Sequence, residues 1–329
     1  MKKLINDVET VLAESLDGFA AAHADIVTLG AERQFVRRRE VKPGKVALIS
    51  GGGSGHEPLH AGFVGHGMLD AACPGQVFTS PTPNQMLAAA QAVDGGAGVL
   101  FIVKNYSGDM MNFQMAAEML DRENATVIVN DDVAVENSTY TTGRRGVAGT
   151  LIVEKIVGAA AERGDKLAAL KSLGDAVNSA TASMGVALSS CTVPAAGKPT
   201  FQIGADEMEM GVGIHGEPGR RRVKLGSADE IAAELTGAIL KDLSLKPGRE
   251  VLLLVNGFGG TPLLELYLMV NAAQKVLAGA GIKAVRFLTG SYVTSLEMAG
   301  CSITVSAVDT AALALWDAPV HTAALRWGR

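Results

Sequence analysis

Short apolar runs alternate along the first part of this chain with stretches that have helical spacing. Residues 4–21 carry apolar side chains at the i, i+3, i+4 spacing of one helix face, which predicts a leading amphipathic helix. Buried strands are predicted at 46–50, 97–105 and 125–133, and helices between them at 84–93 and 112–124. Strands that alternate with helices in this way predict right-handed βαβ units and a parallel sheet.

A long helical region precedes a second part with the same alternation. Residues 149–181 are rich in Ala, Leu, Lys and Glu, which predicts two helices joined near Gly164 and Asp165 and a hinge between domains. Beyond them, strands are predicted at 185–190, 212–215, 250–260, 283–292 and 302–309, and helices at 227–242 and 262–280. We therefore predict an α/β protein with two α/β domains, 1–182 and 183–310, each with a mainly parallel sheet flanked by helices.

Composition excludes several classes of protein. The 329 residues are 48% hydrophobic and 19% charged, which rules out a disordered or collagen-like chain. The net charge of −5 leaves no global basic field to hold nucleic acid or an anionic membrane. Two arginine triplets, 37–39 and 220–222, are compatible with a solvated face or with a docking surface for an acidic partner.

The cysteines and the N-terminus point to a reducing compartment. Cys73, Cys191 and Cys301 are odd in number and far apart, so they predict buried thiols and neither a disulfide framework nor a zinc site. The N-terminal residues carry acidic side chains every few positions, unlike a signal peptide. No later run approaches the ~18 apolar residues of a membrane span, so we expect a cytoplasmic protein.

The candidate chemistry lies just after the predicted strands, where open α/β sheets bind their ligands. These positions are 51–56, 104–109, 131–132, 215–218 and 256–261. The glycine cluster at 51–53 does not end in the Gly-Lys-Ser/Thr of a P-loop, and it has His56 where a Rossmann fingerprint needs glycine. The later NGFGGTP fails both templates, so no nucleotide site is predicted.

Two of these loops carry side chains suited to a small polar ligand. His56 closes the glycine loop and could meet such a ligand beside a backbone donor from Gly53, although the loop could equally be a tight turn with a solvent-facing histidine. Lys104 and Asp109 bracket a Ser-Gly turn. Asp109 could N-cap the following helix, and a carboxylate held there also suits a hydroxyl substrate.

The third loop, GVGIHGEPG, sets His215 between glycines that remove side-chain cover. A neutral imidazole in this position could act as a nucleophile, or as an acid or base near physiological pH. An ordinary loop histidine is the alternative.

Together the loops resemble the dihydroxyacetone kinase family, specifically its substrate-binding K subunit. The matching segments follow the family order and cover nearly the whole chain: KVALISGGGSGHEPLHAGFVGHGMLDAACPGQVFTSPTP, KNYSGDMMNF, NDDVAV, YTTGRRGVAGT, CTVPAAGKP, EMEMGVGIHGEPG and LALWDAPVHTAALRWG. The resemblance implies that this kinase subunit binds dihydroxyacetone and that the tail 311–329 joins the first domain.

The family's functional residues can be carried over position by position. The histidine that forms a hemiaminal with the substrate carbonyl falls on His215, and the acid/base pair at the phosphorylated hydroxyl falls on His56 and Asp109. Substrate-binding positions are implied at Gly53, Lys104, Asp109 and, more weakly, Ser80. No metal site is implied in this chain.

The resemblance also implies partners. ATP-dependent members continue into a helical nucleotide-binding domain, whereas this chain ends at Arg329. We therefore expect the phosphoenolpyruvate-dependent form, in which a separate L subunit holds ADP/ATP and Mg²⁺ and is recharged by a phosphoryl carrier of the phosphotransferase system. A homodimer is expected. The alternative is a ketone-sensing module or co-activator that acts on a transcription regulator; a stand-alone ATP-dependent kinase would need a nucleotide site that the sequence lacks.

Overall fold

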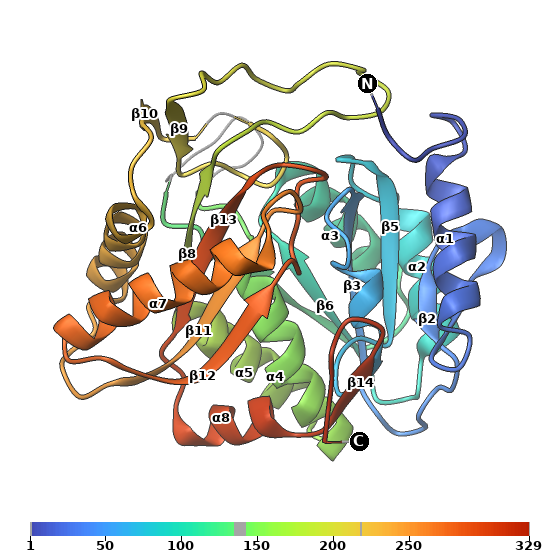
Figure 1. Ribbon diagram of the computed structural model, residues 1–329. Coiled ribbons are helices and arrows are strands. Elements are labelled where there is room, and N and C mark those ends of the chain that lie inside the picture. The colour runs from blue at the N-terminus through green and yellow to red at the C-terminus, as the bar shows by residue number, and fades with distance from the viewer. Residues whose placement is uncertain (1, 135–142, 218, 329) are drawn as a thin grey trace.

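The computed structural model describes residues 2–134, 143–217 and 219–328 (Figure 1). Its first half contains α1 (Val11–Ala22), β1 (Val27–Leu29), β2 (Val36–Arg38), β3 (Ala47–Ser54), β4 (Gly65–His66), β5 (Ala71–Val77), α2 (Pro83–Val93), β6 (Val99–Lys104), α3 (Ser107–Met119) and β7 (Asn124–Val129), with short 3₁₀ turns at Ala31–Arg33 and Ala61–Phe63. The second half contains α4 (Gly149–Arg163), α5 (Leu167–Ser179), β8 (Thr181–Ala187), β9 (Glu207–Met210), β10 (Arg221–Lys224), α6 (Ala228–Leu243), β11 (Glu250–Gly257), α7 (Leu263–Gly279), β12 (Lys283–Gly290), β13 (Gly300–Ser306), α8 (Thr310–Asp317), β14 (Val320–Thr322) and β15 (Arg326–Trp327).

The first sheet has the order β1-β2-β5-β3-β6-β7. Strands β5, β3, β6 and β7 run parallel, as the sequence predicts, and β1 and β2 extend the sheet in antiparallel pairs. Successive side chains of a strand point to opposite faces. Ile49 accordingly joins the core under α2 and α3, and Leu48 joins the core under α4. Burial of both faces explains why these strands have continuous apolar runs.

The second sheet, β10-β9-β8-β13-β11-β12, corrects one prediction. The α/β class is confirmed, but within the described chain this sheet has a single parallel pair, β11 and β12, and antiparallel neighbours elsewhere. Parallel neighbours need a long crossover, usually a helix. Strands β11 and β12 are joined through such a helix, α7, whereas the segment 188–206, which joins the antiparallel neighbours β8 and β9, contains no helix.

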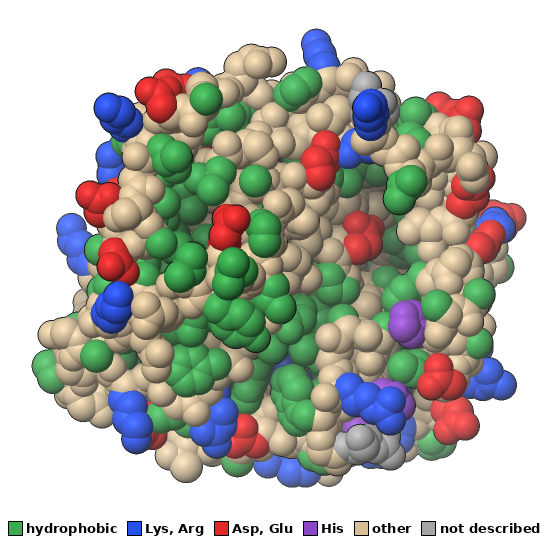
Figure 2. All heavy atoms as spheres, viewed as in Figure 1, with side chains coloured by type: hydrophobic (Ala, Val, Ile, Leu, Met, Phe, Trp, Pro, Cys, Tyr) green, Lys and Arg blue, Asp and Glu red, His purple; other side chains and the backbone are tan. Residues whose placement is uncertain are grey.

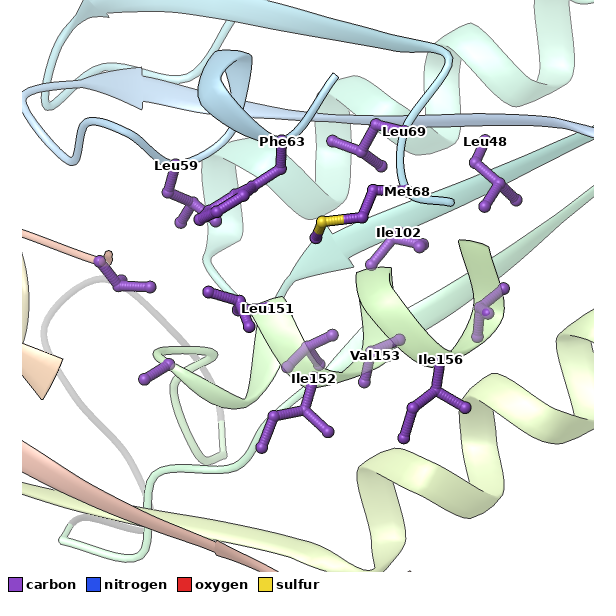
Figure 3. Packing of buried hydrophobic residues seen from close by; sticks show 14 of the residues in the cluster. Leu48, Leu59, Phe63, Met68, Leu69, Ile102, Leu151, Ile152, Val153 and Ile156 are labelled. Carbon is purple, nitrogen blue, oxygen red and sulfur yellow. The ribbon is translucent and has the colours of Figure 1, made fainter. Parts of the chain in front are cut away.

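Helix α4 lies between the two sheets (Figures 1 and 3). Every residue from Gly149 to Ala161 is buried. One apolar cluster joins α4 to Leu48 and Ile102 of the first sheet and to Leu254 of the second. The position between two sheets explains why this helix has no polar face.

Several predicted boundaries were wrong. The leading helix begins at Val11 rather than residue 4, because Asp7 accepts a hydrogen bond from the Glu9 backbone and closes a local turn instead. Residues 212–215 form no strand, the strand predicted to 133 ends at Val129, and the strand of 46–50 continues as β3 through the glycine cluster to Ser54. The two helices joined near Gly164 are confirmed.

The C-terminal segment pairs with the first half of the chain. His321 and Thr322 of β14 pair antiparallel with β4, and β15 continues that small sheet. The division into 1–182 with 311–329 and 183–310 stays a prediction.

One face of the molecule gathers exposed apolar side chains over α7 and β12 (Figure 2). These large exposed residues are Leu263, Leu264, Tyr267, Leu268 and Phe287. By contrast, the three cysteines are buried free thiols, as predicted. None of the helices described is long and apolar enough to cross a bilayer.

Candidate functional site

The site residues meet in a cleft of about 670 Å³ at the carboxyl ends of β3 and β6. Its walls come from the end of β3, the turn before α2, the first turn of α3 and the segments before and after β9. The lining includes Gly53, Ser80, Asp109 and His215, together with Tyr106. Four of the six predicted site residues therefore line one cavity, and the other two contact lining residues, His56 packing against His215 and Lys104 pairing with Asp109.

Gly53 lies inside strand β3, which corrects the prediction of a glycine loop there. A Cβ at this position would lie 2.6 Å from the backbone nitrogen of Thr79. At neighbouring Gly52, a Cβ would overlap the Nζ of Lys104. The glycines thus allow backbone and an ammonium group to approach the strand closely.

His56 is buried against the cleft by contacts from both halves of the chain. Its Nδ1 lies 2.7 Å from the backbone oxygen of Thr294, and its ring stacks on Phe78 at 5.0 Å between centroids. Because a carbonyl only accepts hydrogen bonds, Nδ1 carries the hydrogen and Nε2 the lone pair. Burial is the main cause that holds the pKa of His56 well below 6.5, and the nearby His215 and Lys104 lower this pKa further. This ring is therefore neutral, with an unprotonated Nε2.

His215 stands in the turn after β9, edge-on to three other rings. The centroid of its ring lies 4.7 Å from that of His56, 4.4 Å from that of Tyr106 and 5.5 Å from that of Phe78. Burial, followed by the positive charges of Lys104 and Arg145, lowers the pKa of His215 to about 3. The imidazole is thus in the neutral form that a nitrogen nucleophile requires.

Lys104 and Asp109 form a buried ion pair with 3.5 Å between Nζ and Oδ2. Lys104 ends β6, and Asp109 is the third residue of α3. The predicted N-cap role of Asp109 was wrong, since Tyr106 occupies that position and the helix includes the Ser-Gly pair. The Oδ1 atom of Asp109 is buried and has no hydrogen-bond partner among the described residues, so it is available to a hydroxyl group.

Ser80 occupies the cleft wall opposite the start of α3. A Cβ on Gly108 would lie 2.7 Å from the Oγ of Ser80. The hydroxyl therefore faces the first turn of the helix that carries Asp109.

Sequence reasoning missed His60 and Glu154, which lie behind Lys104. His60 Nε2 is 3.0 Å from Lys104 Nζ, and His60 Nδ1 is 2.7 Å from Glu154 Oε1. His60 falls beyond the stretch that directly follows β3, so the strand-end rule passed over it. The available signal was the charged pair Glu154 and Lys155 in a largely apolar helical run.

Arg145 is a third missed residue, and it supports the segment that carries His215. Its fully buried guanidinium donates to Asp132 at 2.8 Å, to Glu217 at 3.1 Å and to the Gly211 carbonyl at 2.8 Å. The other carboxylate oxygen of Glu217 accepts from the backbone nitrogen of His215 at 3.0 Å. A chain of charged hydrogen bonds thus fixes the backbone under the ring.

The arginine triplets are largely occupied by contacts within the chain. Arg38 pairs with Asp70 and Glu162, Arg221 with Glu234, and Arg222 with Glu209. These contacts favour the solvated-face interpretation of the triplets. No group of three His, Cys, Asp or Glu side chains that could hold a metal occurs in the described ranges.

Comparisons with known proteins agree on one family. The Dak1 domain model matches residues 17–324. The chain is 50% identical, over 100% of both sequences, to the PEP-dependent dihydroxyacetone kinase, dihydroxyacetone-binding subunit DhaK, of Escherichia coli (strain K12).

Two solved structures are similar to nearly the whole of this chain. The dihydroxyacetone kinase operon co-activator Dha-DhaQ superposes with a TM-score of 0.90 at 33% identity, covering 94% of this chain and 97% of its own. The native dihydroxyacetone kinase of C. freundii gives 0.88 at 34% identity, covering 98% of this chain and 60% of that one. Both a kinase and a co-activator therefore share this architecture.

Proposed function

This chain belongs to the Dak1 domain family, and on that premise we propose that it is the dihydroxyacetone-binding subunit of a phosphoenolpyruvate-dependent dihydroxyacetone kinase. Dihydroxyacetone binds in the cleft between His215, His56 and Asp109. Its hydroxyl is then phosphorylated by a nucleotide that another subunit carries.

The observation that carries this proposal is a neutral, buried His215 at the cleft wall. The lone pair of a ring nitrogen forms a bond to the carbonyl carbon of the ketone, and the carbonyl π pair moves to oxygen. That oxygen gains the proton that the imidazole loses from its N–H, so the product is a neutral hemiaminal. An imidazolium could not start this step because its nitrogens have no free lone pair.

His56 and Asp109 are suited to the hydroxyl that is phosphorylated. Nε2 of His56 and Oδ1 of Asp109 are both buried acceptors for which the described residues offer no hydrogen-bond partner. As the hydroxyl oxygen bonds to the γ-phosphorus of ATP, the bond to the ADP oxygen breaks and one of these acceptors takes the hydroxyl proton. Lys104, with Gly53 and Ser80 in the wall, holds the substrate in line.

The donor in this proposal is a separate L subunit with ADP/ATP and Mg²⁺, recharged by a phosphoryl carrier. The absence of any P-loop or Rossmann template in this sequence supports that division. Phosphoryl transfer depends mainly on positioning and electrostatics, so a subunit that only fixes the acceptor can contribute much of the rate. The homodimeric state stays a prediction, which sedimentation of the purified chain tests.

A regulatory role is the second candidate, favoured by the TM-score of 0.90 to an operon co-activator. Such a protein would bind the same ketone in the same cleft and report it to a transcription regulator. The two functions share the site and differ in the partner.

A reconstituted assay separates them. The chain is mixed with an L-type subunit, the phosphoryl carriers and phosphoenolpyruvate, and dihydroxyacetone phosphate is measured. We expect turnover only when all components are present, and none with this chain and ATP alone. Binding of dihydroxyacetone without turnover in the complete mixture would contradict the kinase proposal and favour the regulatory one.

A further inference from the structure

Lys104 is a fully buried ammonium, and a buried charge is stable only when its hydrogen bonds are made. Its Nζ lies 3.0 Å from His60 Nε2 and 3.5 Å from Asp109 Oδ2, and it packs against the bare Cα of Gly52. Asp109 faces the cleft, whereas His60 lies behind the ammonium. The position of the charge therefore depends on a residue outside the cleft lining.

His60 can accept from Lys104 only when its Nε2 carries a lone pair. An ammonium nitrogen has no lone pair with which to accept a hydrogen bond, so Nζ is the donor in this contact. The hydrogen of the neutral His60 ring must therefore sit on Nδ1. Burial is the main cause that holds the pKa of His60 well below 6.5, and the nearby Lys104 and His56 lower this pKa further. The ring is therefore neutral. The geometry thus demands one tautomer.

Glu154 selects that tautomer. Its Oε1 lies 2.7 Å from His60 Nδ1, and the Ser50 hydroxyl lies 3.0 Å from the same nitrogen while it donates to the carbonyl of Ile102. Burial raises the pKa of Glu154 to about 8 despite Lys104 and Ser50. A protonated carboxyl still keeps one acceptor oxygen, so the contact with Nδ1–H holds in either state.

We propose that His60 and Glu154 are positioning residues that hold the ammonium of Lys104 against Asp109 at the floor of the cleft. The order of donation is Lys104 to His60 and His60 to Glu154, from strand β6 through the segment after β3 to the central helix α4. The packing around α4 holds Glu154 in place, because Leu151, Val153 and Ile156 belong to the dry core between the sheets (Figure 3).

The proposed positioning of Lys104 does not depend on the proposed function, but its expected effect on the rate of phosphoryl transfer does. A positive charge held at the site of phosphoryl transfer stabilises the charge that develops on the transferred group. If Lys104 swings away, the substrate can still be captured at His215 but is phosphorylated slowly.

The first test is direct and needs no activity. With ¹⁵N-labelled histidine, the two ring nitrogens of His60 are assigned by comparison with His60→Gln, and their protonation is determined from about pH 6 to pH 8, around the ordinary histidine pKa. We expect a protonated Nδ1 and an unprotonated Nε2 throughout. A hydrogen on Nε2, or titration of this ring near its ordinary pKa, overturns the proposal whether or not the chain supports a kinase.

The second test uses a pair of variants at Glu154. Glu154→Gln keeps an acceptor oxygen for Nδ1–H and should retain the tautomer and wild-type kcat. Glu154→Leu removes the acceptor, and we expect kcat in the reconstituted system to fall by roughly 10–100-fold, with a smaller change in KM for dihydroxyacetone.

Thr150→Val provides the matched control on the same helix. Thr150 is also fully buried, and its hydroxyl makes no hydrogen bond to any described residue, so the near-isosteric change tests the disturbance of α4 alone. Its kcat should match that of the wild type. Equal losses in Glu154→Gln and Glu154→Leu, or in Thr150→Val and Glu154→Leu at matched thermal stability, would contradict the proposal, because a merely structural role of the helix would then suffice.

Discussion

The His56 imidazole, which follows strand β3, donates its Nδ1 hydrogen across 2.7 Å to the backbone oxygen of Thr294, which follows strand β12. Backbone bonds reinforce the contact, from Thr294 nitrogen to the His56 carbonyl at 3.2 Å and from Leu296 nitrogen to the Gly55 carbonyl at 2.8 Å. One segment of the second half of the chain therefore sets the tautomer and the orientation of a ring supplied by the first half.

The fixed tautomer predicts a base at the reacting hydroxyl. His56→Ala and Asp109→Ala should mainly lower kcat, by roughly 10²–10⁴-fold, the usual contribution of general acid–base catalysis. Steady-state rates at varied dihydroxyacetone in the reconstituted system measure this. Near-normal kcat with a raised KM would reduce both residues to binding groups.

Covalent capture by His215 predicts selectivity for the ketone over glycerol. Both molecules have three carbons with a hydroxyl at each end, so hydrogen bonds donated by these hydroxyls to His56 and Asp109 cannot reject glycerol strongly. Only the ketone has an electrophilic carbon for the neutral ring. The ratio of kcat/KM for the two substrates should therefore shrink toward one in His215→Ala. An unchanged ratio would assign the choice to the shape of the cleft.

The low pKa of His215 predicts a pH-dependent stability. An unfolded chain protonates this histidine near pH 6.5, whereas the folded chain does so only near its pKa of about 3. The free energy of unfolding therefore falls as the pH drops between these values, by about 1.4 kcal/mol per pH unit for this group.

His215→Asn should lose that part of the slope. Denaturant unfolding of both proteins from about pH 6 to pH 4, inside that window, measures the difference. Ser80→Ala removes another polar side chain of the cleft without a titrating group, and its slope should equal that of the wild type. A slope unchanged by His215→Asn would show that the ring is already protonated in the folded protein.

The sequence was sufficient for the parts of the fold and site that follow local rules. Apolar runs located β3 and β6, and the rule that ligands lie beyond strand ends led to His56, Lys104 and Asp109. The antiparallel direction of β13 depends on the distant strands with which it pairs, β8 and β11, and the local sequence pattern does not identify these partners. His60 and Glu154 escaped for a similar reason, since a buried polar pair is recognisable only once both partners are placed.

Arg145 predicts how strongly the His215 segment depends on buried charge. Arg145→Met removes the cation and leaves the carboxylates of Asp132 and Glu217 buried and unpaired. Breaking a buried pair in this way costs about 3–5 kcal/mol of unfolding free energy. Chemical denaturation measures the loss, and Arg163→Met, which breaks an exposed pair with Asp165, should cost less than about 1 kcal/mol. Similar losses of unfolding free energy in the two variants would contradict the prediction, because the buried ion pairs of Arg145 would then stabilise the protein no more than an exposed pair does.

An added methyl group should have different effects at two adjacent glycines, because it would meet backbone at one and a flexible side chain at the other. At Gly53 the new Cβ would lie 2.6 Å from the backbone nitrogen of Thr79, which is held in the turn after β5 by its hydrogen bond to the Gln76 carbonyl. Gly53→Ala should therefore destabilise the protein by about 1–3 kcal/mol.

At Gly52 the methyl group would meet the end of the flexible Lys104 side chain, which can swing away. Gly52→Ala should therefore retain more stability than Gly53→Ala but lose activity, because the ammonium no longer reaches Asp109. Thermal unfolding and kcat of the two variants, measured side by side, test the contrast. The reverse ranking of stability, or full activity in Gly52→Ala, would show that the space above Gly52 is not needed to place the charge of Lys104.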